Sequence, residues 1–153
     1  MCNFNSSPIA RNSVFWNNHD VTGTGTLAAS ISNLDGSAIT LTHNLVQGSG
    51  GSSAWTSDPS YVDGGGNLDA DPLFVLPVDP AAAPTTAGNL RLQRGSPAID
   101  AGDNAFVTHP LDLDGNPRAS DGDGDGTATV DMGAYEFTIH PLYLPLILNR
   151  QAE

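Results

Sequence analysis

Short runs of apolar and β-branched residues, separated by small and turn-forming residues, form the pattern of the first half of the chain. The runs are Ile9 to Trp16, Ala28 to Ser32 and Ala38 to Val46, and clusters of Gly, Ser, Thr and Asn separate them. Runs of this length with such boundaries are typical of β-strands. Helix-forming residues never recur at i, i+3, i+4 spacing without Gly, Pro, Asn or Asp intervening. The pattern predicts an all-β fold with many turns.

Two of these segments resemble each other. Residues 7–15 match residues 37–46 if one residue is inserted before Asn44, so the spacing is 30 to 31 residues. This spacing suits one coil of a solenoid, in which apolar residues point inward and asparagines at the bends bond the backbone and stack between coils. We expect Asn12 and Asn44 to form such a pair. Because a solenoid needs about three repeats to bury its core, we expect the chain to be an N-terminally truncated fragment.

From Asn67 the chain alternates short strands and tight turns around four motifs. In chain order they are NLDADPLF (67–74), LRLQRGSPAIDAG (90–102), DLDGNPR (112–118) and VDMGAYEF (130–137). The ordered set resembles the C-terminal region of bacterial choice-of-anchor Q domain proteins, of the pectate-lyase-like superfamily. NSVFWNN (12–18) is similar to that family's coil pattern. The resemblance implies a right-handed parallel β-helix, a single-stranded solenoid, on an exported or cell-surface protein, but it implies no reaction.

The resemblance divides the chain into three segments. Residues 1–66 are expected to form the last β-helix coils, residues 67–137 the C-terminal cap region, and residues 138–153 an apolar tail. The tail carries YLPLIL, is interrupted by Pro145 and is too short to cross a bilayer. It resembles a C-terminal signature of exported bacterial proteins, which implies a sorting or surface-retention tag. The alternative is a final edge strand that covers the end of the solenoid.

The charge balance limits the classes of partner. The chain has 17 acidic and 5 basic residues, a net charge of -12, and no lysine. Such a surface repels phosphate backbones and anionic lipid headgroups, which argues against nucleic-acid binding. No apolar run approaches the ~20 residues of a membrane-spanning helix, and no export signal opens the chain. The single cysteine, Cys2, permits no internal disulfide.

The alternating Asp and Gly residues from Asp121 to Gly126 are the sharpest candidate for chemistry. Such a loop can place several oxygens around Ca²⁺ at ~2.4 Å, and it resembles the loops of dockerins and EF-hands. Position twelve of that pattern is Met132, and no helices flank the loop. Structural calcium and a solvated turn that binds nothing tightly therefore stay open as alternatives. The candidate ligands are Asp121, Asp123, Asp125, Thr127 and Asp131.

Arg118 has three candidate partners within the cap region. The acidic residues Asp100, Asp131 and Glu136 lie in neighbouring motifs, and the sequence does not choose between them. A buried pair of this kind fixes geometry more than it adds stability.

Two tryptophans, Trp16 and Trp55, are candidates for stacking on a sugar ring. The alternative is structural, because Trp16 continues an apolar strand and Trp55 can anchor a Gly/Ser loop. Only Arg11 offers a strong base in the coil region, and no pair of carboxylates can be placed at catalytic separation. We therefore assign no catalytic residue.

Two functions from different classes follow. The first is a non-catalytic C-terminal cap and surface-attachment segment of an exported adhesin-like or stalk β-helix protein, outside the cell or on its surface. The second is the C-terminal part of a carbohydrate-active β-helix enzyme, a polysaccharide lyase or glycoside hydrolase, with its active site in upstream coils. The cap motifs, the acidic surface and the tail favour the first. In both cases the expected partners are polysaccharide or cell-surface components.

Overall fold

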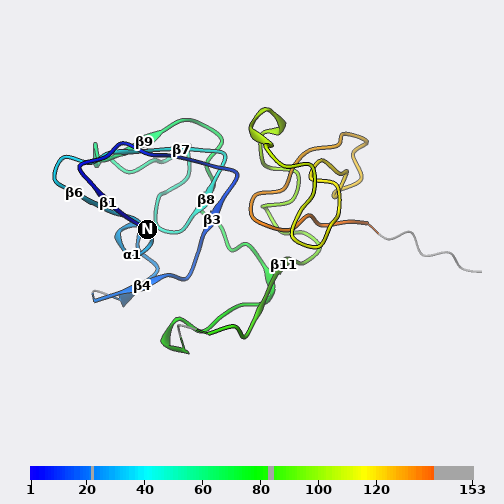
Figure 1. The fold of residues 1–153 in the computed structure, drawn as a ribbon, viewed down its shortest axis with the longest axis horizontal. Helices are drawn as coiled ribbons and strands as arrows, with labels where there is room; N and C mark the ends of the chain where they lie inside the picture. Colours follow the sequence, from blue (N-terminus) through cyan, green and yellow to red (C-terminus); the bar gives the residue numbers. More distant parts are fainter. Residues whose placement is uncertain (22, 83–84, 140–153) are drawn as a thin grey trace, which may run out of the picture.

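Parallel strand pairs organise the first part of the fold. The computed structural model describes residues 1–21, 23–82 and 85–139. Three strands from the start of the chain each pair in parallel with a later strand (Figure 1). The pairs are β1 (Cys2–Phe4) with β6 (Ser32–Leu34), β2 (Ile9–Arg11) with β7 (Ile39–Thr42), and β3 (Val14–Phe15) with β8 (Leu45–Val46). On the other side of β7, β9 (Tyr61–Asp63) completes a three-stranded sheet.

The register confirms the predicted repeat spacing. Cys2 pairs with Ser32, and Ile9 pairs with Thr40, which gives offsets of 30 and 31 residues. The predicted pairing of Asn12 with Asn44 is wrong, because the pairing of Val14 with Leu45 places Asn44 beside Ser13.

Asn44 instead links three successive segments of the chain. Its Oδ1 accepts the N–H of Ser13 at 3.0 Å, and its Nδ2 donates to the Ala10 carbonyl at 2.9 Å. On the other side, the Oδ1 of Asn67 accepts from the Asn44 backbone N–H at 2.9 Å and from its side chain at 3.3 Å. Because Asn44 is fully buried, these bonds replace the water that its carboxamide would otherwise bind.

The expectation of a right-handed parallel β-helix, with the chain forming its last coils and cap, is wrong. The described strands are two to four residues long and gather in five small sheets, of which the largest has three strands. Two sheets are antiparallel hairpins, β4 (His19–Asp20) with β5 (Gly23–Thr24) and β10 (Phe74–Leu76) with β11 (Asn89–Leu92). Bends at residues with positive φ, such as Asn5, Asn12 and His43, end several strands before a continuous solenoid sheet forms over the described residues.

One predicted strand begins as a helix. Residues 28–32 were expected to be extended, but α1 (Leu27–Ser30) occupies most of this run, before β6 begins. The Oγ1 of Thr26 accepts the N–H of Ala29 at 3.1 Å and so caps the helix N-terminus. Two single turns of 3-10 helix complete the elements, η1 (Pro80–Ala82) and η2 (Asn104–Phe106).

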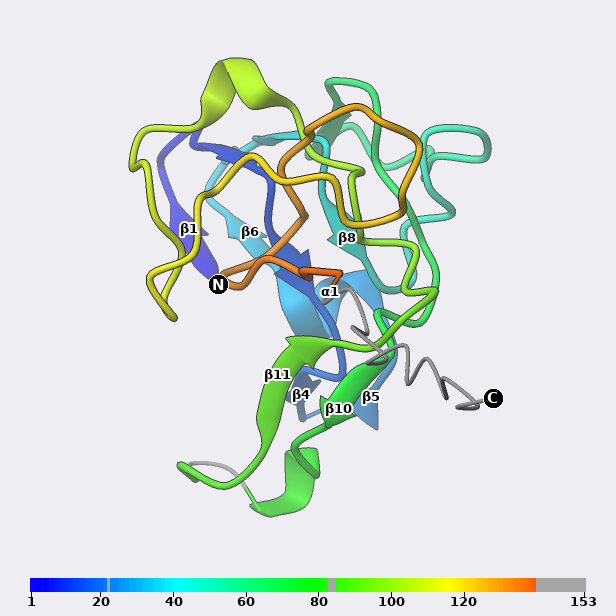
Figure 2. The same cartoon turned by 90° about the vertical axis from the view of Figure 1, so that its right-hand side faces the viewer.

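Two apolar clusters hold the molecule together. The first lies inside the parallel pairs and contains Leu27, Ile31, Ile39, Leu41, Val46 and Tyr61. The second joins β8 to the C-terminal segment and contains Leu45, Leu92, Ala98 and Met132. Figure 2 shows the hairpin β10–β11 projecting from the rest of the molecule.

Asn12 ties the first strands to the C-terminal segment. Its side chain bonds both backbone groups of Asp103, receiving the N–H on Oδ1 at 2.9 Å and donating Nδ2 to the carbonyl at 3.0 Å. Its own carbonyl accepts the N–H of Gly133 at 2.8 Å. Residues 98–137 therefore pack against the side of the strand pairs, at the bend between β2 and β3 (Figure 1).

Within the described residues, no helix has the length and apolarity that crossing a bilayer requires. Residues 140–153, which carry the predicted sorting signature, lie outside the described residues.

Candidate functional site

The Asp/Gly loop is held by its own carboxylates. Asp121 accepts the N–H groups of Gly124 at 2.7 Å and Gly126 at 2.9 Å, one on each carboxylate oxygen. Asp123 accepts the N–H of Asp125 in a similar local turn. These turns fix the backbone of the loop without a helix on either side, which is the context that the sequence indicated.

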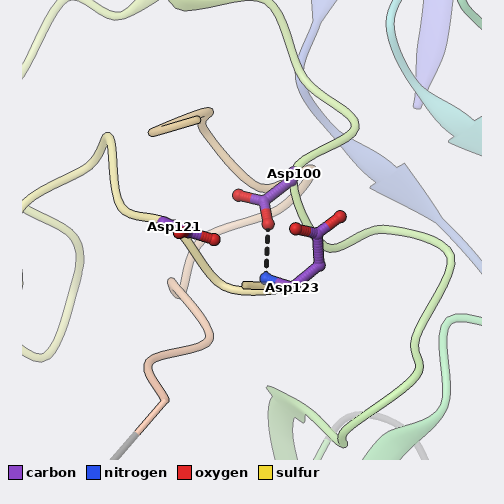
Figure 3. Close-up of side chains that lie close together, drawn as sticks. All are labelled: Asp100, Asp121 and Asp123. Carbon is purple, nitrogen blue, oxygen red and sulfur yellow. Dashed lines mark hydrogen bonds between the residues drawn. The ribbon is translucent and has the colours of Figure 1, made fainter. Parts of the chain in front are cut away.

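Asp100 brings a third carboxylate to Asp121 and Asp123. One carboxylate oxygen from each of the three residues lies within 4.8 Å of the others (Figure 3). Asp100 Oδ2 accepts the N–H of Gly122 at 2.9 Å and that of Asp123 at 2.7 Å, so it fixes the loop directly. Asp100 Oδ1 is buried and accepts no hydrogen bond from the described residues. A buried carboxylate oxygen without a donor is a position that a cation would satisfy.

Gly122 permits this close approach. A Cβ atom at residue 122 would lie 2.9 Å from the Phe137 carbonyl oxygen and 2.9 Å from the Ile99 side chain. Both contacts are too short for a carbon atom, so the loop reaches Asp100 only because residue 122 has no side chain.

The electrostatics of the cluster are unfavourable without a cation. Burial raises the pKa of Asp100, the N–H groups of Asp123 and Gly122 lower it, and the charges of Asp123 and Asp121 raise it again. The net pKa lies above the ordinary value, because burial, together with the smaller repulsion from the charges of Asp123 and Asp121, outweighs the two hydrogen bonds. A bound divalent cation would reverse this balance.

Three of the sequence-predicted ligands lie outside this cluster. Asp125 and Thr127 are exposed further along the loop, where Asp125 Oδ1 accepts the Thr127 N–H. Asp131 is buried and turned inward, and its two oxygens accept the N–H groups of Asp100 at 2.8 Å and Phe137 at 2.6 Å. Asp131 thus positions the backbone of Asp100. Both oxygens of the Asp131 carboxylate already accept backbone N–H groups.

Asp100 was absent from the predicted ligands. It lies 21 positions before Asp121 and belongs to a separate motif, SPAIDAG, so loop spacing alone could not find it. The structure shows Asp100 in a left-handed backbone conformation, φ 51°, but no local pattern in the sequence joins it to the Asp/Gly loop.

Arg118 pairs with Glu136, which settles the three alternatives. Arg118 Nη1 lies 3.0 Å from Glu136 Oε1 and also donates to the Gly133 carbonyl at 3.0 Å. The Glu136 side chain is completely buried, and its carboxylate accepts the Asp131 N–H at 3.2 and 3.3 Å. Burial, and next the charge of Asp131, raise the pKa of Glu136 to about 8. Burial likewise raises the pKa of Asp131 to about 6.

The two tryptophans have different surroundings. Trp55 packs against the first apolar cluster, and its Nε1 donates to the Tyr61 carbonyl at 2.9 Å, so this indole covers the free edge of β9. Trp16 packs against the second cluster and lines a hollow beside the β10–β11 hairpin. Of the two candidates for ligand stacking, Trp16 is the one that borders open space.

No family model, no curated protein and no solved structure matches the chain. The resemblance to choice-of-anchor Q domain proteins therefore stays a prediction that rests on the sequence motifs. Function has to be inferred from the geometry of the residues themselves.

Proposed function

We propose that residues 98–137 form a non-catalytic, calcium-stabilised structural unit of an exported surface protein. The observation that carries this proposal is the gathering of the Asp100, Asp121 and Asp123 carboxylates, in which Asp100 also has a buried oxygen, Oδ1, with no donor among the described residues. The acidic, lysine-free composition and the motif resemblance support the surface location. In this proposal the unit stabilises the fold and converts no substrate.

Calcium fits the donor set better than a transition metal. The cluster offers only carboxylate oxygens, and Ca²⁺ prefers oxygen ligands, whereas zinc and copper favour histidine and cysteine. Asp100, Asp121 and Asp123 would hold the ion, and solvent could complete its shell because Asp123 is exposed. The ion would join the loop to the turn at Asp100 and reduce the repulsion between the three carboxylates.

The alternative function, a carbohydrate-active enzyme, has no comparable support. The pKa values of the Asp100, Asp131 and Glu136 carboxylates are raised. Asp131 and Glu136 are buried and bonded to backbone N–H groups, so a substrate cannot reach them. Their arrangement fits a structural role.

Calcium is expected to raise the thermal stability of the chain, and Asp100→Asn and Asp123→Ala are expected to abolish this effect. At a calcium concentration 100 times the dissociation constant, the folded state gains about 2.7 kcal/mol. For a chain of this size, that gain shifts Tm by roughly 5–10 °C. The measurement is thermal unfolding by circular dichroism, with calcium and with a chelator.

Asp125→Ala is the matched control, because it removes a carboxylate from the same loop but outside the cluster. It should retain the calcium-dependent shift. If wild type and all three variants melt identically with calcium and with chelator, the proposed function is wrong. If Asp125→Ala alone loses the shift, the ion lies elsewhere in the loop and the assignment of Asp100 is wrong.

A further inference from the structure

A groove lies between the end of β3, the β10–β11 hairpin and residues 132–135. It consists of two adjoining hollows of ≈ 560 and ≈ 450 Å³, which share Val14, Phe74 and Leu90 as common walls. Both volumes fall in the range of small-molecule sites. The first hollow is also lined by Trp16, Asn17, Asn18 and His19. The second is also lined by Leu92, Met132 and Tyr135.

The lining is free of acidic and basic side chains, apart from His19, although the chain has 17 acidic residues. Three aromatic residues, Trp16, Phe74 and Tyr135, are distributed along the groove. The neutral lining disfavours a charged ligand, because an ion would lose its hydration without gaining a partner. The rings of Trp16 and Phe74 favour a ligand with flat apolar faces, whereas the Arg91 guanidinium covers one face of the Tyr135 ring, 4.5 Å from its centroid.

Polar side chains lie at both ends of the groove. Asn17 and Asn18 line the first hollow, and Tyr135 lines the second. Asn17 is held in place, because its N–H donates to Gln47 Oε1 at 2.8 Å and its Nδ2 donates to the Val78 carbonyl at 3.1 Å. Asn17 thus fastens the hairpin to β3, and the wall of the groove is formed before any ligand arrives.

We propose that this groove binds a neutral oligosaccharide. A sugar chain combines apolar ring faces, which stack on aromatic side chains, with hydroxyl groups that bond carboxamide and phenol groups. The groove offers both kinds of contact, and the guanidinium that borders it, that of Arg91 beside Tyr135, is already paired with Asp114 and so offers little to an anionic polysaccharide. With a net charge of -12, the chain also repels polyanions at long range.

The groove and the calcium cluster are separate sites. None of the lining residues is Asp100, Asp121 or Asp123. Sugar binding is therefore expected to persist in the presence of a chelator at a temperature where the chain is folded. A failure of one proposal leaves the other untouched.

Leu90→Glu is expected to weaken sugar binding by at least about tenfold. It places a charge between the two hollows, and Leu90 is already 45% exposed, so the fold should tolerate the change. Leu76→Glu is the matched control, since Leu76 lies on the same hairpin, is 57% exposed and does not line the groove. Titration calorimetry would use cellohexaose, xylohexaose and maltohexaose as neutral probes and polygalacturonate as the anionic probe.

The proposal predicts that at least one neutral probe binds to wild type and Leu76→Glu, more weakly to Leu90→Glu, and that polygalacturonate does not. Trp55→Phe leaves Trp16 as the only tryptophan, so its fluorescence should change when the bound probe is added. Absence of binding by all three neutral probes would overturn the proposal. So would equal binding by the two glutamate variants, or tighter binding of a proline-rich peptide in competition.

Discussion

Asn44→Ala is expected to lower the free energy of unfolding by about 3–4 kcal/mol, a large fraction of the stability of an ordinary domain. The substitution leaves the Ser13 N–H and the Ala10 carbonyl without their partner, and it removes the side-chain bond to Asn67. Each unsatisfied buried group costs about 1–3 kcal/mol. Urea denaturation, followed by circular dichroism, measures the loss.

Asn18→Ala is the control for this experiment. Asn18 is exposed, and its side chain donates to Ser30 Oγ at 3.2 Å, so its loss should cost less than about 1 kcal/mol. A comparable loss in both variants would show that the chain responds to any asparagine replacement. The hydrogen bonds of Asn44 would then contribute no more to the free energy of unfolding than those of an exposed asparagine.

Raising the pH from 5 to 8.5 is expected to destabilise the wild type, and Glu136→Gln should remove most of this dependence. The folded-state pKa of Glu136 is raised to about 8 by burial and by the Asp131 charge. A carboxyl group with a raised pKa contributes stability that is fully present below its unfolded pKa. That contribution is lost as the pH rises through the folded value. The loss is on the order of 3 kcal/mol across this window.

The acid side of the stability profile has a different origin. Burial opposes ionisation of Asp112, but the N–H groups of Glu136 and Asn116 outweigh it and lower its pKa. Stability from Asp112 is therefore present above its unfolded pKa and lost as the pH falls below about 4. The two effects place the expected stability maximum near pH 4 to 5.

Chemical unfolding at several pH values measures both effects. Asp35→Asn serves as the control because Asp35 is an exposed carboxylate in a turn, and its profile should follow the wild type. If Glu136→Gln retained the wild-type decline above pH 5, the buried carboxyl would not be its source. A steeper decline in Glu136→Gln would contradict the sign of the Glu136 contribution.

The local pattern of the sequence predicted the strands better than their assembly. The runs 9–16 and 38–46 contain strands, because alternation and flanking turn residues act over a few positions. The same local pattern does not tell which strands pair with one another, or how many strands a sheet contains. A solenoid was therefore expected from the 30–31 residue repeat, although the described sheets stay small and include two hairpins.

In the candidate site, too, the sequence predicted the residues that are close together in the chain but not those that are brought together by the fold. Asp121 and Asp123 were predicted from their spacing in one loop, and the structure brings both together. Asp100 and the inward orientation of Asp131 depend on contacts between residues more than twenty positions apart. Spacing also could not choose the partner of Arg118, because that choice depends on which carboxylate is buried beside it.

The bonds of Asn12 have a consequence for the order of folding. They join the first strands to Asp103 and Gly133, across 91 residues in the first case. Contacts between residues this distant in sequence form only when a long loop closes. The conformational entropy lost on closing that loop slows folding. During synthesis the strand pairs emerge first. The apolar surface around Leu45 stays uncovered until Leu92, Ala98 and Met132 have been synthesised and pack against it. The apolar residues of the second cluster that emerge early are therefore exposed to aggregation until the C-terminal segment docks.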